Sequence, residues 1–131
     1  EVFVRFYRSL ERFRGEASVG TYLTRIAINL SLNHIKRRKR DAARYGGGTD
    51  ELRDLADPSD RTAERAETEA VRAAIRELPP NYRAVVVLRL VRGYSTGETA
   101  RMLKAPIGTV LSRLARAQRM LRESLADYRR E

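Results

Sequence analysis

The chain has 131 residues, of which 34% are charged and 42% hydrophobic, and its formal net charge is +10. This length allows one modest domain or two small helical ones, each with a thin core. With no cysteine and a single histidine, the sequence excludes disulfide frameworks, thiolate metal sites and histidine-rich metal clusters. No apolar run approaches the roughly 18 residues of a membrane span, and no secretory signal is evident. We therefore expect a cytoplasmic protein with no cofactor and no membrane insertion.

The charge is divided unevenly along the chain. Counting Lys and Arg against Asp and Glu gives +7 for residues 1–45, −4 for 46–77 and +7 for 78–131. Each basic lobe would attract a polyanion, because phosphate contacts supply most of the non-specific affinity for nucleic acids. Charge alone leaves open the alternative of a helical protein with an ordinary solvated basic surface.

The first basic lobe is predicted to hold two helices. Phe3, Phe6, Tyr7, Leu10 and Phe13 recur at helical spacing, and "RGEASVG" (14–20) then interrupts the pattern with two glycines. A second helix is expected from about Thr21 to Arg38. Two apolar stripes along it predict packing on two sides, one made of Leu23, Ala27, Leu30 and His34 and the other of Ile28, Leu32 and Ile35. His34 is therefore expected to be a packed histidine and not a ligand.

Between the two stripes the second helix carries a polar ridge with one aromatic residue, composed of Tyr22, Arg25, Asn29, Asn33, Lys36 and Arg40. Asparagine is a poor helix former, so two asparagines one turn apart on the same face suggest a functional reason. Tolerated surface asparagines remain the alternative.

The middle of the chain is predicted to be a flexible acidic linker over 46–60, because three consecutive glycines, a proline and an acidic run cannot bury a core. The next helix is expected to be capped near Asp57, with Pro58 at its first position. It should bury Val71, Ile75 and Leu78. Residues 79–93 contain "VVVL", which would suit a strand or a helix, but Pro80 near the start and Gly93 past the end favour a helix.

The last third of the chain predicts a helix-turn-helix over residues 95–119. Ser95 and Glu98 form an S-x-x-E capping box that opens a short helix, which ends at 104–106 before a longer helix from about Ile107. On the longer helix, a mainly apolar side made of Ile107, Val110, Leu111, Leu114, Ala117, Gln118 and Leu121 opposes a polar face made of Thr109, Ser112, Arg113, Arg116 and Arg119. Small hydroxyls permit close approach to a duplex, and arginines reach base edges or phosphates.

At these residues the chain resembles the extracytoplasmic-function (ECF) sigma factors, small two-domain promoter-specificity subunits of bacterial RNA polymerase. Residues 1–40, "EVFVRFYRSLERFRGEASVGTYLTRIAINLSLNHIKRRKR", resemble their region 2. Residues 78–125, from "LPPNYRAVVVLRLVRG" to "AQRMLRESL", resemble their region 4. The resemblance predicts an all-α protein with region 2 over 1–45, a linker over 46–60 and region 4 over 61–131.

The resemblance also implies partners and site residues. Region 2 would bind the β′ clamp helices of core RNA polymerase and capture the single-stranded -10 element, while region 4 would dock on the β flap and read the -35 duplex. An anti-sigma factor is a further expected partner. Asn29 matches the position associated with the flipped -10 base, and the basic run that includes Lys36, Arg37 and Arg40 would hold the adjoining phosphates. The pocket around the base would be formed by the segment Gly15, Glu16, Ala17, Ser18 and Val19.

Several positions depart from the family pattern. Leu111 and Gln118 replace basic residues that are common in the -35 surface, and Tyr22 stands where tryptophan is frequent. The chain also begins without an initiating Met and without the upstream helix of region 2, so region 2 is expected to be incomplete at its N-terminus.

Two other classes of protein were weighed. A dimeric helix-turn-helix regulator would read duplex operators, but its dimerisation lobe would not need a ridge suited to single strands. A nuclease or recombinase would need clustered carboxylates for metal ions, whereas nine of the 17 acids lie in residues 46–77. We therefore expect a non-catalytic sigma factor.

Overall fold

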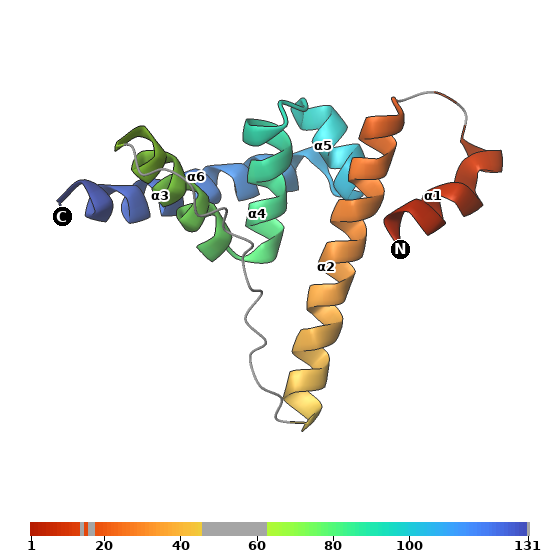
Figure 1. Ribbon diagram of the computed structural model, residues 1–131, viewed down its shortest axis with the longest axis horizontal. Coiled ribbons are helices and arrows are strands. Elements are labelled where there is room, and N and C mark those ends of the chain that lie inside the picture. The colour runs from red at the N-terminus through yellow and green to blue at the C-terminus, as the bar shows by residue number, and fades with distance from the viewer. Residues whose placement is uncertain (14, 16–17, 46–62, 131) are drawn as a thin grey trace.

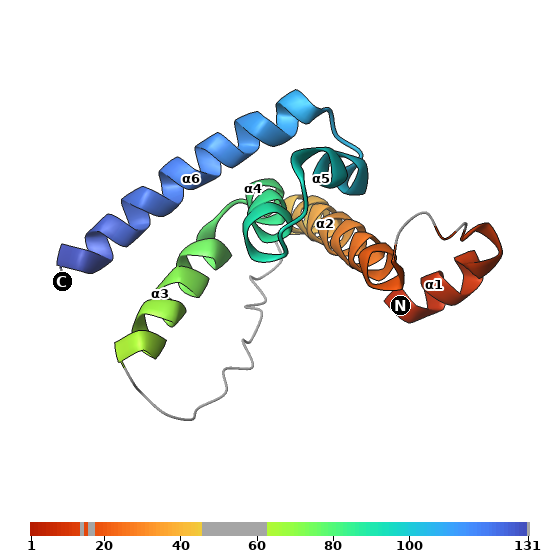
Figure 2. The ribbon, with the colours of Figure 1, turned by 90° about the horizontal axis from the view of Figure 1, so that it is seen from above.

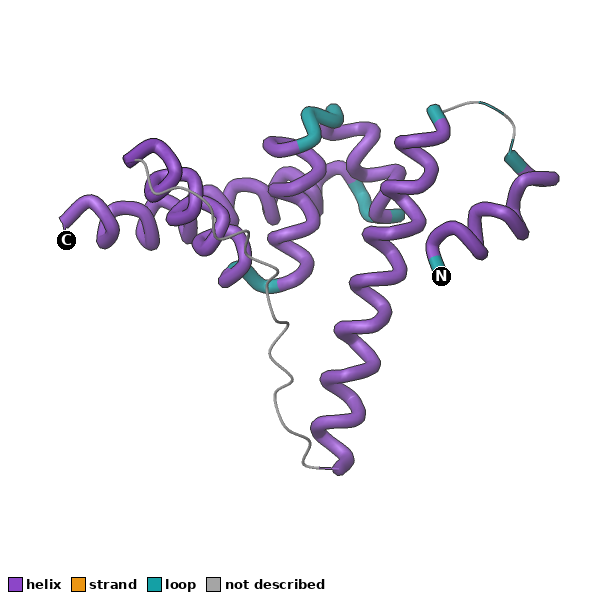
Figure 3. The backbone as a smooth tube through the Cα atoms, in the orientation of Figure 1, coloured by secondary structure: helices purple, strands orange, loops and turns teal. Residues whose placement is uncertain are grey.

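The computed structural model describes residues 1–13, 15, 18–45 and 63–130, and all regular elements among them are helical (Figure 3). The all-α expectation is thus confirmed for this part of the chain. The elements in order are α1 (Val2–Ser9), the 3-10 turn η1 (Leu10–Arg12), α2 (Val19–Tyr45), α3 (Ala63–Glu77), α4 (Pro80–Val86), the π-helical turn η2 (Val87–Val91), α5 (Thr96–Leu103) and α6 (Ile107–Arg130). The expected linker and the helix cap at Asp57 and Pro58 lie outside the described residues. No helix in the described ranges is long and apolar enough to cross a membrane.

The first lobe, defined as α1, η1 and α2, is held together by an aromatic cluster. The ring of Tyr22 lies 5.8 Å from that of Phe6 and 5.1 Å from that of Phe13, measured between centroids. The N-terminus of α2 is capped by Ser18, whose Oγ accepts a hydrogen bond from the Thr21 amide at 3.1 Å. No described residue of this lobe is fully buried. Its thin core agrees with the small size of the lobe.

The second lobe, defined as α3 to α6, contains the main core. Val85, Leu88, Val110 and Ala117 are completely buried. They come from α4, η2 and α6, and Figure 2 shows α6 running along α3, α4 and α5. The "VVVL" segment is therefore helical, as its flanking residues predicted. Gly93 follows η2 with a φ of +75°, a left-handed conformation that glycine adopts without strain.

Two expectations about burial are wrong. Val71 on α3 is 42% exposed, although Ile75 is half-buried and Leu78 buried as expected. His34 on α2 is exposed and not packed. The reason at His34 is that α1 lies beside the N-terminal half of α2 only (Figure 1), and no other described helix covers this residue. Helical periodicity identifies residues that share a face, but not whether a partner covers that face.

The two lobes lie against each other. Figures 1 and 2 show α2 between α1 on one side and α4 and α5 on the other. Among the described residues, one side-chain hydrogen bond across the boundary joins Thr21 Oγ1 and the Tyr94 hydroxyl at 3.3 Å, and another runs from Asn29 Nδ2 to the Met102 carbonyl oxygen at 2.9 Å. Helix α2 therefore packs on two sides, as expected, but Tyr22 and Asn29, which make contacts on these sides, lie on the polar ridge and not on an apolar stripe.

Candidate nucleic-acid interface

The helix-turn-helix opens on the predicted capping box. Ser95 Oγ accepts a hydrogen bond from the Glu98 amide at 3.1 Å, and the Glu98 carboxylate accepts one from the Ser95 amide at 3.4 Å. These bonds satisfy two backbone donors that the first turn of α5 would otherwise leave without partners. The start of α5 is thereby fixed by residues that the sequence alone identifies.

The turn between α5 and α6 depends on one left-handed residue. Lys104 has φ of +52° and ψ of +46°, and the Ala105 amide donates to the Ala100 carbonyl at 3.0 Å. A second bond runs from the Lys104 amide to the Arg101 carbonyl at 3.3 Å, which completes the Schellman pattern of helix ends. The chain reverses within this turn and starts α6 at Ile107, so the geometry is that of the expected helix-turn-helix.

The outer face of α6 carries the residues predicted to contact duplex DNA. Val110 and Ala117 anchor the inner side in the core, whereas Ser112, Arg116 and Arg119 are exposed and Thr109 and Arg113 are half-buried. Leu111 and Ile107, which the sequence placed on the apolar side, are also more than half exposed. Leu111 therefore lies at the surface beside Ser112, and adds an apolar group next to the basic face.

Arg116 has a partner that sequence reasoning missed. Its guanidinium Nη1 lies 3.5 Å from the hydroxyl of Tyr82 on α4, and this contact raises the pKa of Arg116 above its ordinary value. The ring of Tyr82 packs against the core residues Leu78, Val86 and Ala117. The contact joins residues 34 positions apart, so no local pattern could have revealed it.

The predicted ridge on α2 is partly covered. Tyr22 is half-buried in the aromatic cluster of the first lobe, and Arg25 is half-buried further along. Asn29 is half-buried and donates two hydrogen bonds from Nδ2, one to the Arg25 carbonyl at 3.0 Å and one to the Met102 carbonyl at 2.9 Å. Asn33 remains exposed. The ridge is thus one continuous face whose middle touches the second lobe.

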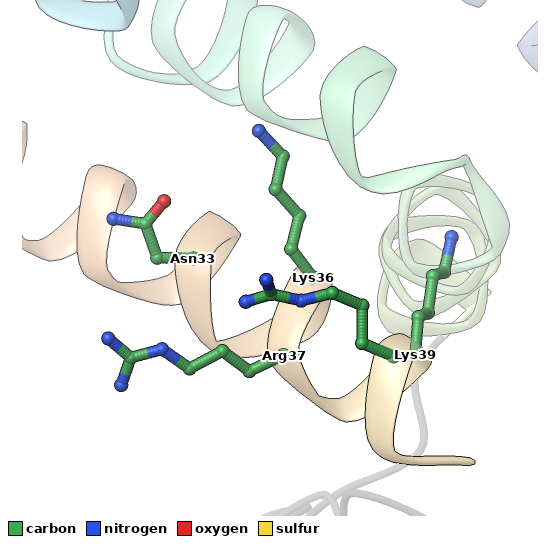
Figure 4. A pocket seen from close by; sticks show the side chains of 5 residues that line it. Asn33, Lys36, Arg37 and Lys39 are labelled. Carbon is green, nitrogen blue, oxygen red and sulfur yellow. The ribbon is translucent and has the colours of Figure 1, made fainter. Parts of the chain in front are cut away.

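Beyond Asn33 the ridge becomes an open basic surface. A hollow of about 580 Å³ is lined by Asn33, Lys36, Arg37, Lys39 and Arg40, with no carboxylate among the lining residues. Figure 4 shows these side chains extending from one stretch of α2, with Lys36 directed toward a neighbouring helix. Several cations along one face of a helix can pair with successive phosphates of a DNA strand.

The segment expected to form a base pocket is only partly described. Gly15 has a φ of +70°, Ser18 caps α2, and Val19 is about half exposed. Glu16 and Ala17 lie outside the described residues. The described part places Ser18 and Val19 at the N-terminal end of the ridge.

The two predicted DNA faces meet across one cleft, which the sequence did not reveal. The cleft has a volume of about 370 Å³, with Asn29, Leu32, Asn33 and Lys36 lining it from α2. The second lobe lines it with residues of α4, the α5–α6 turn and α6, including Asn81, Lys104, Thr109 and Arg113. No carboxylate lines the cleft, so it is a polar and basic site.

Comparison with known proteins assigns both lobes to one family. Residues 1–41 match the family described as Sigma-70 region 2, and residues 68–121 match Sigma-70 region 4. The RNA polymerase sigma-H factor of Pseudomonas aeruginosa is 36% identical over 141 residues, covering 100% of this chain and 72% of that protein. The ECF RNA polymerase sigma-E factor of Haemophilus influenzae is 33% identical over 135 residues, covering 95% of this chain and 71% of that protein.

A solved structure shows the same fold. The sigma factor RpoE of Bartonella quintana, in complex with the anti-sigma factor NepR, superposes with a TM-score of 0.75 at 19% identity. The match covers 95% of this chain and 76% of that one.

Proposed function

Because the chain belongs to the ECF sigma factors, which recognise promoters for RNA polymerase and initiate transcription, we propose that its two lobes divide promoter recognition between them. The first lobe, over residues 1–45, takes the single-stranded -10 element. The second, over 61–131, reads the -35 element as duplex, and residues 46–60 connect the two. The dimeric regulator is not favoured, because the first lobe also matches a sigma-factor family.

The observation that carries the proposal is the outer face of α6. A recognition helix must be fixed by its inner side and free on its outer side. On α6, Val110 and Ala117 are fully buried on the inner side, and Ser112, Arg116 and Arg119 are exposed outside. Ser112 leaves room for the groove edge because its side chain is short. Its hydroxyl donates to the Thr109 carbonyl at 3.1 Å, so its lone pairs remain available to accept a hydrogen bond from an amino group on a base edge.

In the first lobe we assign base capture to Asn29, with support from Asn33 one turn further along. A carboxamide presents a donor and an acceptor together, which matches the edge of an unpaired base. Tyr22, at the N-terminal end of the ridge and half-buried against Phe6 and Phe13, is the aromatic group that we assign to stacking. Lys36, Arg37 and Arg40 hold the phosphates. The protein catalyses no reaction, and melting is driven by the binding energy of the captured strand.

Contact with core polymerase is proposed through both lobes. The first lobe binds the β′ clamp helices. The second lobe offers a groove of about 590 Å³ between α3 and the end of α6, lined by Val71, Leu121, Leu125 and Tyr128 among others. Its apolar floor suits a helix of the β flap. The exposure of Val71, which periodicity did not predict, is explained if this groove is covered in the holoenzyme.

The groove is tested by Val71→Asp, with Ala66→Asp as a matched control because Ala66 is exposed on the same helix and does not line the groove. We expect Val71→Asp to weaken binding to core polymerase at least tenfold, since a carboxylate would be desolvated against apolar side chains. Equal affinities of the two variants for core polymerase would refute the assignment.

We also propose control by an anti-sigma factor, in the cytoplasm where polymerase acts. The support is that the related RpoE structure was solved as such a complex. An anti-sigma protein that binds this chain should displace it from core polymerase in a competition assay. Simultaneous binding of both would argue against this part of the proposal.

The division of labour is tested with two probes, a single-stranded DNA and a duplex, each selected on the full chain from a random pool. Asn29→Ala should weaken binding of the single strand and leave duplex affinity undiminished. Arg116→Ala should weaken binding of the duplex and leave the affinity for the single strand undiminished. Equal losses on both probes for either variant would contradict the assignment of separate faces.

A further inference from the structure

The exposed face of α6 differs from the polar face that the sequence predicted. Figure 2 shows α3, α4 and α5 along one side of α6, which leaves its opposite side at the surface. The exposed residues in the first part of the helix recur at spacings of three and four, and they are Ile107, Gly108, Leu111, Ser112, Ala115, Arg116 and Arg119. Thr109 and Arg113 are only half-buried members of its border, beside the cleft. The surface offered to a duplex therefore includes Leu111.

Leu111 is 51% exposed, and Ile107, one turn earlier, is 54% exposed. We propose that Leu111, supported by Ile107, is a specificity-determining residue that contacts the C5-methyl group of one thymine in the major groove. Both residues lie near the N-terminus of α6, the part of a recognition helix that meets base edges. The inference rests on the proposed function, because it needs α6 to be the helix that enters the groove.

The fold itself does not use the Leu111 side chain. Leu114, and not Leu111, packs against the buried cluster that contains Val85 and Val110. An exposed leucine is ordinary when it stands alone, but here a second apolar residue lies four positions away on the same face. Leu111 and Ile107 therefore form a small apolar surface that the packing of the second lobe leaves open.

The neighbours of Leu111 on this face have short side chains. Gly108 lies three residues before it and Ala115 four residues after it, and both are exposed. A Cβ at Gly108 would meet no atom within 4 Å, so internal packing does not require glycine there. Glycine also weakens a helix relative to alanine. Close approach of a groove gives this position a reason, and it lets the leucine protrude to the bases.

Thymine is the base whose chemistry suits this side chain. In the major groove the other bases present hydrogen-bonding groups, whereas thymine adds an apolar methyl group. A leucine placed over guanine, cytosine or adenine would remove polar groups from water without replacing their hydrogen bonds. Leu111 would therefore favour thymine both by the contact that it makes and by the penalty on the alternatives.

The charge of the same face favours DNA over an apolar protein partner. Residues 107–122 contain no Asp or Glu, and the first acid of α6 is Glu123. At about 100° per residue, Leu111 and Arg116 lie on the two edges of the face, with Ser112 and Ala115 between them. A helix with this face in a groove would bring its arginine and its leucine to different bases, so the two contacts can be separated by experiment.

The test removes one methyl group from the DNA. A duplex is selected on the full chain from a random pool, and each thymidine is replaced in turn by deoxyuridine, which lacks only the C5-methyl group. We expect wild type to bind about fourfold more weakly at one position, the effect of one methyl group removed from water. Leu111→Ala should bind the original duplex more weakly by a similar factor, and should show no further loss with deoxyuridine at that position.

Leu90→Ala is the matched control, because Leu90 is also 51% exposed and lies on η2, outside α6. It should respond to deoxyuridine as wild type does. Selection repeated on Leu111→Ala should lose thymine at the sensitive position only, a result that a structural role of Leu111 would not produce. All three proteins should melt alike, since both leucines are exposed.

Two results would overturn the inference alone. One is a selected duplex that wild type binds equally well with thymidine or deoxyuridine at every position, which would leave the apolar surface to a protein partner. The other is an equal loss with deoxyuridine in wild type and Leu111→Ala. Failure of any duplex to bind would instead overturn the proposed function, and this inference with it.

Discussion

Substitution of Arg116 isolates the contribution of one side chain to the reading of duplex DNA. The guanidinium is exposed, and it approaches the Tyr82 hydroxyl at 3.5 Å, which is too long for a strong hydrogen bond. Arg116→Ala should therefore change the free energy of unfolding by less than about 0.5 kcal/mol. If Arg116 reads a base edge, the loss of binding free energy is about 1 to 3 kcal/mol, or roughly 5- to 150-fold in Kd.

The assay is fluorescence anisotropy of a pool-selected duplex at several salt concentrations, with Arg72→Ala as the control because Arg72 is exposed on α3 and is not part of the polar face of α6. A base contact predicts a loss on the selected duplex that is larger than the loss on random duplex. A phosphate contact predicts equal losses on both and a salt slope lowered by about 1. Affinity equal to that of Arg72→Ala at every salt concentration would refute the assignment of α6 as the recognition helix.

Two further predictions concern the stability of the helix-turn-helix. Ser95→Ala removes the capping oxygen that accepts a hydrogen bond from the Glu98 amide. It should lower the free energy of unfolding by about 1 kcal/mol, measured as a fall of about 4–8 °C in Tm. An unchanged Tm would show that the capping box is not formed in solution. Lys104→Gly removes the steric strain of a side chain at a left-handed φ of +52°, and should raise the free energy of unfolding by about 1 kcal/mol. Lys104→Ala keeps a Cβ and should not raise it. Equal melting curves for these two variants would contradict the turn geometry.

The features that the sequence predicted correctly depend on neighbours in the chain. The capping box needs Ser95 and Glu98 only, and Gly93 ends its helix through its own backbone conformation. The inner side of α6 follows from the 3.6-residue period, which places Val110 and Ala117 together. Such features are local, so residue types and spacing suffice to specify them.

The features that the sequence missed depend on how the lobes meet. Asn29 and Met102 are 73 residues apart, as are Thr21 and Tyr94, and no periodicity relates them. His34 shares a face with apolar residues but no described helix covers it. Whether a face is covered is set by the arrangement of whole helices, and a single sequence carries little information about that arrangement.

Transcription by core polymerase tests the central claim most directly. The full-length protein is added to core polymerase with a pool of promoter fragments, and run-off transcripts are compared for wild type, Asn29→Ala and Arg116→Ala. The account predicts transcripts from a defined set of promoters, severe loss with Asn29→Ala on all of them, and loss with Arg116→Ala that depends on the -35 sequence. Transcription that is unchanged by both substitutions would contradict it.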